Sequence, residues 1–193
     1  LKLIIGSEFQ FSDGLRCVLL ATSRKGYGQL CRLITQGRRA AEKGTYRLEW
    51  RDVFDHEDDS LSFLQDCLAL WLPAADPDVT QAQRPQSAFP ERLWIAVELL
   101  TSGNDRKRLE RLQTVGSDLQ IPLVASGDVH MHVRGRRALQ DTVTAIRLGI
   151  PVQQAGLALF PNGERHLRRI ERLQPLYPPA LLKESPAIAA RGH

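Results

Sequence analysis

The chain has 193 residues, 42% hydrophobic and 25% charged, and its 26 basic residues exceed its 22 acidic ones to give a net charge of +4. This composition is typical of about one globular domain, and it excludes a disordered chain, a collagen-like fibre and a disulfide-dense secreted module. No apolar stretch approaches the roughly 18 residues that a membrane-spanning helix needs, so we expect a cytoplasmic protein with no membrane partner. The chain begins at Leu1 and its single methionine is Met131, from which we expect a piece of a longer protein.

In chain order, the apolar run Lys2–Ile5 predicts a short buried strand, and the run Leu15–Thr22 predicts a second strand. Apolar residues spaced three and four apart then predict an amphipathic helix that runs from Gly26 to about Glu42. The acid-rich stretch Thr45–Ser60 is interpreted as a loop or a surface helix.

The run Leu68–Leu72 predicts a third strand, and the proline-rich stretch Pro73–Pro90 predicts a surface connection. The run Leu93–Leu100 predicts a fourth strand, and the spacing of apolar residues over 109–119 predicts a second helix. The short run Leu123–Ala125 predicts a fifth strand.

A further helix is expected over 139–146, closed by Gly149 and Pro151, and the tail from Pro161 to His193 is rich in arginine and proline. Short apolar runs thus alternate with helical patterns. We therefore predict an α/β fold with a parallel sheet or barrel.

Functional groups in parallel α/β folds gather just past the carboxyl ends of the strands. Glu8 follows the first predicted strand, and Asp128 and His130 follow the fifth. On extended backbone, an Asp-x-His pair points both side chains the same way, and mixed carboxylate and imidazole ligands suit Zn, Mn or Fe. The pair predicts half of a metal site, to which Glu8 adds a third ligand if the fold brings it near. From spacing alone the alternative stays open that Asp128 binds loop amides and that the histidine is solvated.

A basic cluster of Arg134, Arg136 and Arg137 opens the helix that follows this pair. Its side chains are candidates for contact with nucleic-acid phosphates, and a solvated surface face is the alternative. The sequence holds no phosphate-binding P-loop, no dinucleotide-binding glycine fingerprint and no GxSxG nucleophile elbow.

Residues 3–9 and 19–34 resemble the PHP (polymerase and histidinol phosphatase) domain of bacterial C-family DNA polymerase alpha subunits. Residues 127–132, 136–147 and 159–168 resemble the error-prone branch of that family, which acts in damage-induced mutagenesis. The resemblance covers nearly the whole chain in collinear order.

The resemblance implies a PHP-type distorted (β/α)7 barrel, incomplete at the N-terminus. Residues 1–150 would form the partial barrel, and residues 151–193 would end the PHP domain and begin the connection to the polymerase core. It also implies a cluster of divalent metal ions (Zn, Mn or Mg) at the barrel mouth. Glu8, Asp128 and His130 match ligand positions of the family motif, whereas Arg16 and Ala74 stand where the motif has ligands.

These departures imply a degenerate metal site, so we expect the segment to support the polymerase structurally, and we assign no catalytic residue. The parent enzyme would be a DNA-directed DNA polymerase that uses Mg and acts in translesion synthesis and DNA repair. Its partners would be DNA, the remaining polymerase domains, the sliding clamp and mutagenesis accessory proteins. Two alternatives remain open: a metal-dependent phosphoesterase or 3′-5′ exonuclease of the PHP class, and a non-catalytic module that binds DNA or a protein partner.

Overall fold

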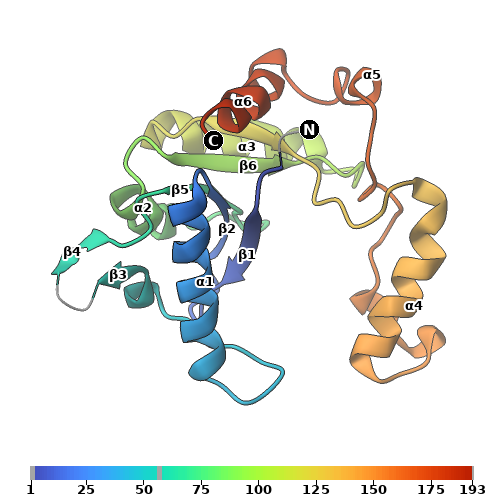
Figure 1. The fold of residues 1–193 in the computed structure, drawn as a ribbon. Helices are drawn as coiled ribbons and strands as arrows, with labels where there is room; N and C mark the ends of the chain where they lie inside the picture. The colour runs from blue at the N-terminus through green and yellow to red at the C-terminus, as the bar shows by residue number, and fades with distance from the viewer. Residues whose placement is uncertain (1–2, 56–57, 193) are drawn as a thin grey trace.

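The computed structural model describes residues 3–55 and 58–192, which form a mixed α/β fold (Figure 1). One sheet contains five strands in the order β1-β2-β5-β6-β7, and β3 and β4 form a separate hairpin. The strands are β1 (Gly6–Gln10), β2 (Arg16–Ala21), β3 (Phe54–Asp55), β4 (Asp58–Ser62), β5 (Cys67–Trp71), β6 (Leu93–Glu98) and β7 (Leu123–Ser126). The α-helices are α1 (Arg24–Arg39), α2 (Val79–Ala88), α3 (Asp105–Leu119), α4 (Arg137–Leu148), α5 (Ile170–Leu173) and α6 (Pro179–Ala190). Short 3₁₀ turns are η1 (Trp50–Val53), η2 (Arg134–Arg136), η3 (Val152–Gln154) and η4 (Gly156–Ala158).

The sheet is mixed, so the expectation of a wholly parallel sheet was wrong. Strands β5, β6 and β7 are parallel, but β2 runs antiparallel to both β1 and β5. The link from β1 to β2 is too short for the crossover that parallel strands require, so the two strands form a hairpin. In the described residues β1 and β7 lie at the two edges of an open sheet.

The predicted first strand was misplaced. Leu3, Ile4 and Ile5 precede β1 and are exposed, with 82% of the Leu3 surface accessible, while Lys2 lies outside the described residues. Pairing with β2 selects Gly6–Gln10 as the strand instead, and within it Phe9 enters the core. Glu8 therefore lies inside a strand and not past its carboxyl end.

The remaining predicted strands and the three predicted helices are present with small shifts of their ends. Helices α2, α5 and α6 and the β3–β4 hairpin were missed. Helix α2 lies in the stretch interpreted as a surface connection. A helix forms there because Asp78 caps its first turn, and Pro85 is accommodated within it. The β3–β4 hairpin lies in the stretch interpreted as a loop or surface helix, of which residues 56 and 57 are outside the described residues. Helix α6 lies in the tail and begins at Pro179, a favoured first helical residue.

The two faces of the sheet differ in their covering. Alternate residues of β5, such as Cys67, Ala69 and Trp71, join the main core, to which α1, α2 and α3 contribute their buried apolar side chains. On the opposite face Trp94 packs with Ile188 of α6 in a smaller apolar cluster. The opposite face also carries the polar residues described in the next section.

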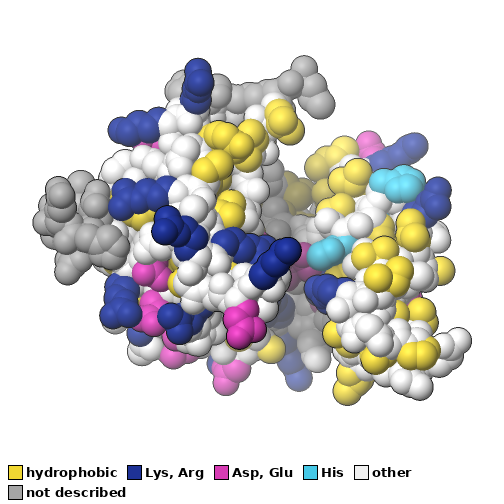
Figure 2. Space-filling view, turned by 60° about the horizontal axis from the view of Figure 1, so that its bottom comes forward, with side chains coloured by type: hydrophobic (Ala, Val, Ile, Leu, Met, Phe, Trp, Pro, Cys, Tyr) yellow, Lys and Arg dark blue, Asp and Glu magenta, His cyan; other side chains and the backbone are white. Residues whose placement is uncertain are grey.

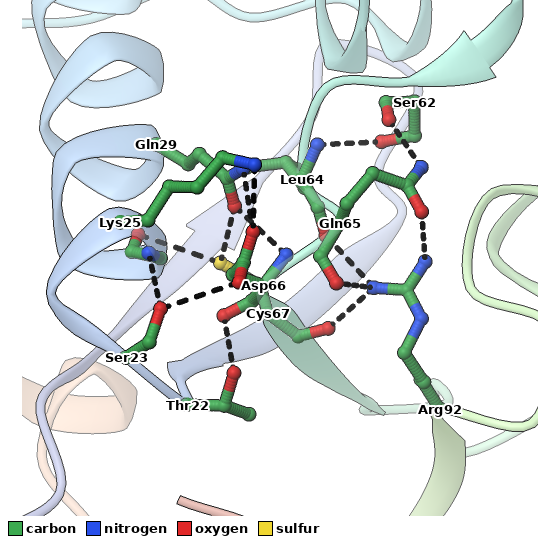
Figure 3. A network of polar contacts seen from close by, with 11 residues as sticks. Thr22, Ser23, Lys25, Gln29, Ser62, Leu64, Gln65, Asp66, Cys67 and Arg92 are labelled. Atoms are coloured by element: carbon green, nitrogen blue, oxygen red, sulfur yellow. Dashed lines mark hydrogen bonds and ion pairs between the residues drawn. The ribbon is translucent and has the colours of Figure 1, made fainter. Parts of the chain in front are cut away.

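Helix α1 is fixed to the start of β5 by a polar network (Figure 3). Ser23 caps the helix by accepting a hydrogen bond from the backbone N–H of Gly26, and its hydroxyl also donates to the carboxylate of Asp66. Gln29 both donates to that carboxylate and accepts from the Asp66 backbone N–H at 3.0 Å. A Cβ atom on Gly26 would lie 2.1 Å from the Asp66 carbonyl oxygen, so only glycine permits this approach.

Arg92 stabilises the same segment from the other side (Figure 3). Its Nη1 donates to three backbone carbonyl groups at 2.7–2.9 Å, those of Leu64, Gln65 and Cys67. A planar guanidinium that meets several carbonyl groups holds the chain in one conformation, which sets where β5 begins.

Helix α4 stands apart from the sheet as an arm, joined to the body by the segments before and after it (Figure 1). The base of the arm is held by backbone pairing, since the N–H groups of His130 and Met131 donate to the carbonyl of Arg165. Large apolar side chains of α4 are exposed, including Leu139, Val143 and Ile146, the last with 74% of its surface accessible. Figure 2 shows hydrophobic side chains spread over the surface of the arm.

The C-terminal tail ties the parallel strands together. The Tyr177 hydroxyl accepts a hydrogen bond from the N–H of Leu99 and donates to the carbonyl of Ser126, so it bridges the ends of β6 and β7. The Trp94 indole donates to Glu184 of α6 at 2.9 Å, and the guanidinium of Arg191 lies over its ring. No helix within the described ranges is long and apolar enough to cross a membrane.

Candidate functional site

A polar cluster lies where β6 and β7 end, on the sheet face opposite α1. Glu98 is the last residue of β6 and is paired in register with Ser126, the last residue of β7. Parallel neighbours end at the same edge of a sheet, so Glu98 and the segment that follows β7 are brought together. The sequence analysis missed Glu98, although its place at the end of the fourth predicted strand was a signal that could have found it.

The environment of Glu98 favours a proton on its carboxyl group. Burial first, and then the charge of Asp128, raise the pKa of Glu98, although three arginines act against this shift: Arg16, Arg108 and Arg165. Its Oε1 atom is buried and has no hydrogen-bond partner among the described residues.

Asp128 and His130 are in contact with each other, but not on the extended backbone that the sequence analysis assumed. The backbone of Asp128 has a φ of +42°, a left-handed conformation and not an extended one. Its Oδ1 lies 3.0 Å from Nε2 of His130, and its Oδ2 accepts from Nε of Arg165 at 2.5 Å. Burial alone would raise the pKa of Asp128, but Arg165 and His130 outweigh that effect and lower it.

Phe160 completes this side of the cluster. Its ring centroid lies 4.9 Å from that of His130 and 4.2 Å from the guanidinium carbon of Arg165. The ring therefore holds the two side chains that contact Asp128, and a cation over an aromatic face is an attractive contact.

Glu8 forms an ion pair with Arg16, and no contact joins it to Asp128 or His130 among the described residues. The Arg16 Nη2 and Nε atoms lie 2.6 and 3.0 Å from Glu8 Oε1, across the β1–β2 hairpin. Burial lowers the pKa of Arg16, but the hydrogen bond and charge of Glu8, together with the charges of Glu98 and Asp128, raise it overall. Arg16 is thus paired with Glu8 and also lies within the electrostatic influence of Glu98 and Asp128.

A divalent metal does not fit these side chains as they are arranged. Within residues 3–55 and 58–192 no group of three or more His, Cys, Asp and Glu side chains is placed to hold a metal ion. Glu8 and Asp128 are each already paired with an arginine, whose charge cannot be shed at ordinary pH. The cluster therefore balances its carboxylates with guanidinium groups.

The predicted phosphate-contacting arginines have different surroundings. Arg134 pairs with Glu164 at 2.9 Å, and Arg137 donates to the carbonyl of Phe160 and lies 3.6 Å from Asp141. Arg136 is exposed. The three side chains begin the arm, and their role in nucleic-acid contact stays a prediction.

Fold and site together define a mixed α/β domain with an arginine-balanced carboxylate cluster at the ends of its parallel strands. No protein-family model matches the chain. The chain is 56% identical over 190 residues to an error-prone DNA polymerase of Methylococcus capsulatus, 54% identical over 191 residues to one of Pseudomonas fluorescens, and 52% identical over 194 residues to one of Dechloromonas aromatica. These matches cover 98–99% of this chain but 18% of each relative, so the chain spans less than a fifth of their length.

Proposed function

We propose that this chain is a segment of an error-prone DNA polymerase and that the segment supports the polymerase structurally. The observation that carries the proposal is the identity of 52–56% to three proteins of that name over nearly the whole chain. The whole enzyme would extend primers on damaged DNA with Mg²⁺ bound in its own core, in the cytoplasm. DNA, the other polymerase domains, the sliding clamp and mutagenesis accessory proteins would be its partners.

The same proposal assigns the segment to the PHP type, as an incomplete (β/α)7 barrel. The open sheet supports this assignment, because β1 and β7 are both left as edges that further strands could cover. Residues 1–150 would belong to the barrel, and residues 151–193 would lead towards the polymerase core.

In this proposal the predicted ligands Glu8, Asp128 and His130 form a degenerate metal site with a structural role. The support is the pairing of the two carboxylates with arginines: Glu8 pairs with Arg16, and the Asp128 and Arg165 side chains are each less than one-fifth exposed and lie 2.5 Å apart. A charge-assisted hydrogen bond at such a half-buried position contributes about 1.5–3 kcal/mol to stability.

Metal analysis of the purified chain separates this role from hydrolysis. After incubation with Zn²⁺ or Mn²⁺ and gel filtration, we expect no stoichiometric metal, and no release of nucleotides from a 3′-labelled oligonucleotide. Bound metal at one or more ions per chain, with metal-dependent release, would instead establish the phosphoesterase or exonuclease alternative.

A double-mutant cycle tests the structural role directly. Asp128→Asn and Arg165→Gln should each lower the free energy of unfolding, and the cycle should give a coupling of about 1–3 kcal/mol. Additive effects would show that the pair does not stabilise the fold. The polymerase assignment is tested separately, by primer extension with the complete polypeptide encoded by the reading frame that contains this sequence.

A further inference from the structure

A basic pocket at the base of the arm carries an inference that goes beyond this function. The pocket has a volume of about 470 Å³ and lies between the arm and the C-terminal tail. Its basic lining comes from separate elements: Arg134 from η2, His166 and Arg168 from the segment that returns from the arm, and Arg172 from α5. Glu164, Pro175 and Leu176 complete the wall.

The charge of the pocket is only partly balanced by the protein. Its single carboxylate, Glu164, is paired with Arg134 at 2.9 Å and is only 14% exposed. Neither Arg168 nor Arg172 forms an ion pair with any residue that the structure describes. The pocket therefore keeps about two uncompensated positive charges.

Arg168 is anchored at the wall of the pocket. Its Nη1 donates to the carbonyl of Leu99 at 3.0 Å, which fixes the guanidinium. Its Nη2 is buried and has no hydrogen-bond partner among the described residues. The guanidinium therefore keeps its full positive charge beside the pocket, with no carboxylate of the described residues paired to it.

Arg134 is also held in place. A Cβ atom on Gly163 would lie 3.1 Å from Cγ of Arg134, so the missing side chain of Gly163 makes room for the arginine stem. The turn that presents Gly163 is closed by the Asn162 side chain, which accepts from the N–H of Glu164 and donates to the carbonyl of Leu100. Arg134 and Arg168, from two separate elements, thus both line the pocket.

We propose that this pocket binds the phosphate group of a nucleotide, either free or within a DNA strand. Guanidinium groups match the oxygens of a phosphate in bidentate geometry, and the net positive charge suits a ligand with more charge than one carboxylate. The apolar side chains of Pro175 and Leu176 offer a surface for the sugar or base. The choice of DNA as the source rests on the proposed function, whereas the phosphate pocket itself does not.

The test compares two double variants with equal loss of charge. Arg168→Gln with Arg172→Gln removes the uncompensated charges of the pocket, and Arg39→Gln with Arg147→Gln removes two exposed arginines, of α1 and α4, that do not line it. Binding of a fluorescein-labelled 12-mer oligothymidylate is followed by fluorescence anisotropy at 50 and 150 mM NaCl. We expect the pocket variant to weaken binding about tenfold and the control variant less than about threefold. The salt slope should fall by more than one unit for the pocket variant only.

Because Arg168 contacts Leu99, its replacement could disturb the fold, so Arg172→Glu serves as a second variant. Arg172 is exposed and forms no ion pair in the described part of the chain, and its reversal should weaken binding with an unchanged circular dichroism spectrum. Equal losses for both double variants would overturn the proposal in favour of diffuse surface charge. The absence of oligonucleotide and dTTP binding at 50 mM NaCl, or equally tight binding of a polyglutamate peptide, would also overturn it.

Competition separates the two sources of phosphate. Displacement of the oligonucleotide by dTTP at equal nucleotide concentration would identify a free nucleotide as a ligand, and displacement only by unlabelled oligonucleotide would identify the strand. Both outcomes support the pocket. Binding by this chain and primer extension by the complete polypeptide are independent measurements, so the failure of one is distinguishable from the failure of the other.

Discussion

Replacement of Gly26 by alanine should destabilise the fold strongly, against the usual preference of helices for alanine. In an open helix position, Gly→Ala stabilises by about 0.5–1 kcal/mol. At Gly26 the new Cβ would lie 2.1 Å from the Asp66 carbonyl oxygen, about 0.9 Å inside the 3.0 Å that Cβ atoms respect. The contact is with backbone, which cannot rotate away, so either α1 or the start of β5 must move.

A shift of that size would lengthen the hydrogen bonds between α1 and Asp66, of which the Gln29 bond is only 3.0 Å long. Overpacking typically costs about 1–3 kcal/mol, and the loss of this network adds to it. The matched control is Gly28→Ala, because Gly28 lies in the same helix and a Cβ there would meet nothing within 4 Å. We therefore expect the free energy of unfolding of Gly26→Ala to be about 2–3 kcal/mol lower than that of Gly28→Ala.

The assay is urea denaturation followed by circular dichroism at 222 nm. With a slope of about 2 kcal/mol per molar urea for a chain of this size, the midpoints of the two variants should differ by about 1 M or more. The urea midpoint of Gly37→Ala should lie between those of the two variants. Its Cβ would meet the side chain of Leu48 at 2.8 Å, and a side chain can move aside in part. The reasoning is refuted if Gly26→Ala unfolds at the same urea concentration as Gly28→Ala or above it.

Three further predictions concern single contacts. Arg92→Lys should lower the free energy of unfolding by about 2–4 kcal/mol, since an ammonium group cannot reach the three backbone carbonyl groups together, and urea denaturation would measure the loss. Ser23→Ala should cost about 1 kcal/mol by the same assay, because the cap of α1 is lost. Burial raises the pKa of Tyr177, so the wild-type protein should lose stability as pH rises above about 10, the value in the unfolded chain. Tyr177→Phe should be about 1–2 kcal/mol less stable at pH 7 and should show a smaller alkaline loss, and an identical pH profile for both proteins would contradict this explanation.

The local spacing of apolar residues was sufficient to predict the long helices and most strands, but it was insufficient to predict how the strands pair. The apolar spacing of α1 and α3 and the left-handed cap at Gly149 follow from short-range chemistry, and these elements were predicted. The antiparallel pairing of β2 with β5 joins residues that lie about fifty positions apart in the sequence, which no local window contains. The run 3–5 was misassigned for the same reason, since hydrophobicity alone does not state which residues find a partner strand.

The candidate site was predicted in part. Asp128 and His130 were found from their spacing and their place after the fifth run, and they are in contact. Their neighbour Arg165 was missed as a partner, because it lies 37 positions further along the chain, on the segment that returns from the arm. The pairing of Glu8 with Arg16 across a hairpin required knowledge of the register, and a one-residue slip would place the two side chains on opposite faces.

Trp94 gives the protein a built-in optical probe. The three tryptophans are Trp50, Trp71 and Trp94, and Trp94 contacts the tail through Glu184 and Arg191. Detachment of α6 would expose an indole that is now 5% accessible and would shift its emission to longer wavelength, while Trp71, 1% accessible in the main core, would keep its blue emission. With the other two tryptophans replaced by phenylalanine, fluorescence would distinguish release of the tail from unfolding of the whole sheet.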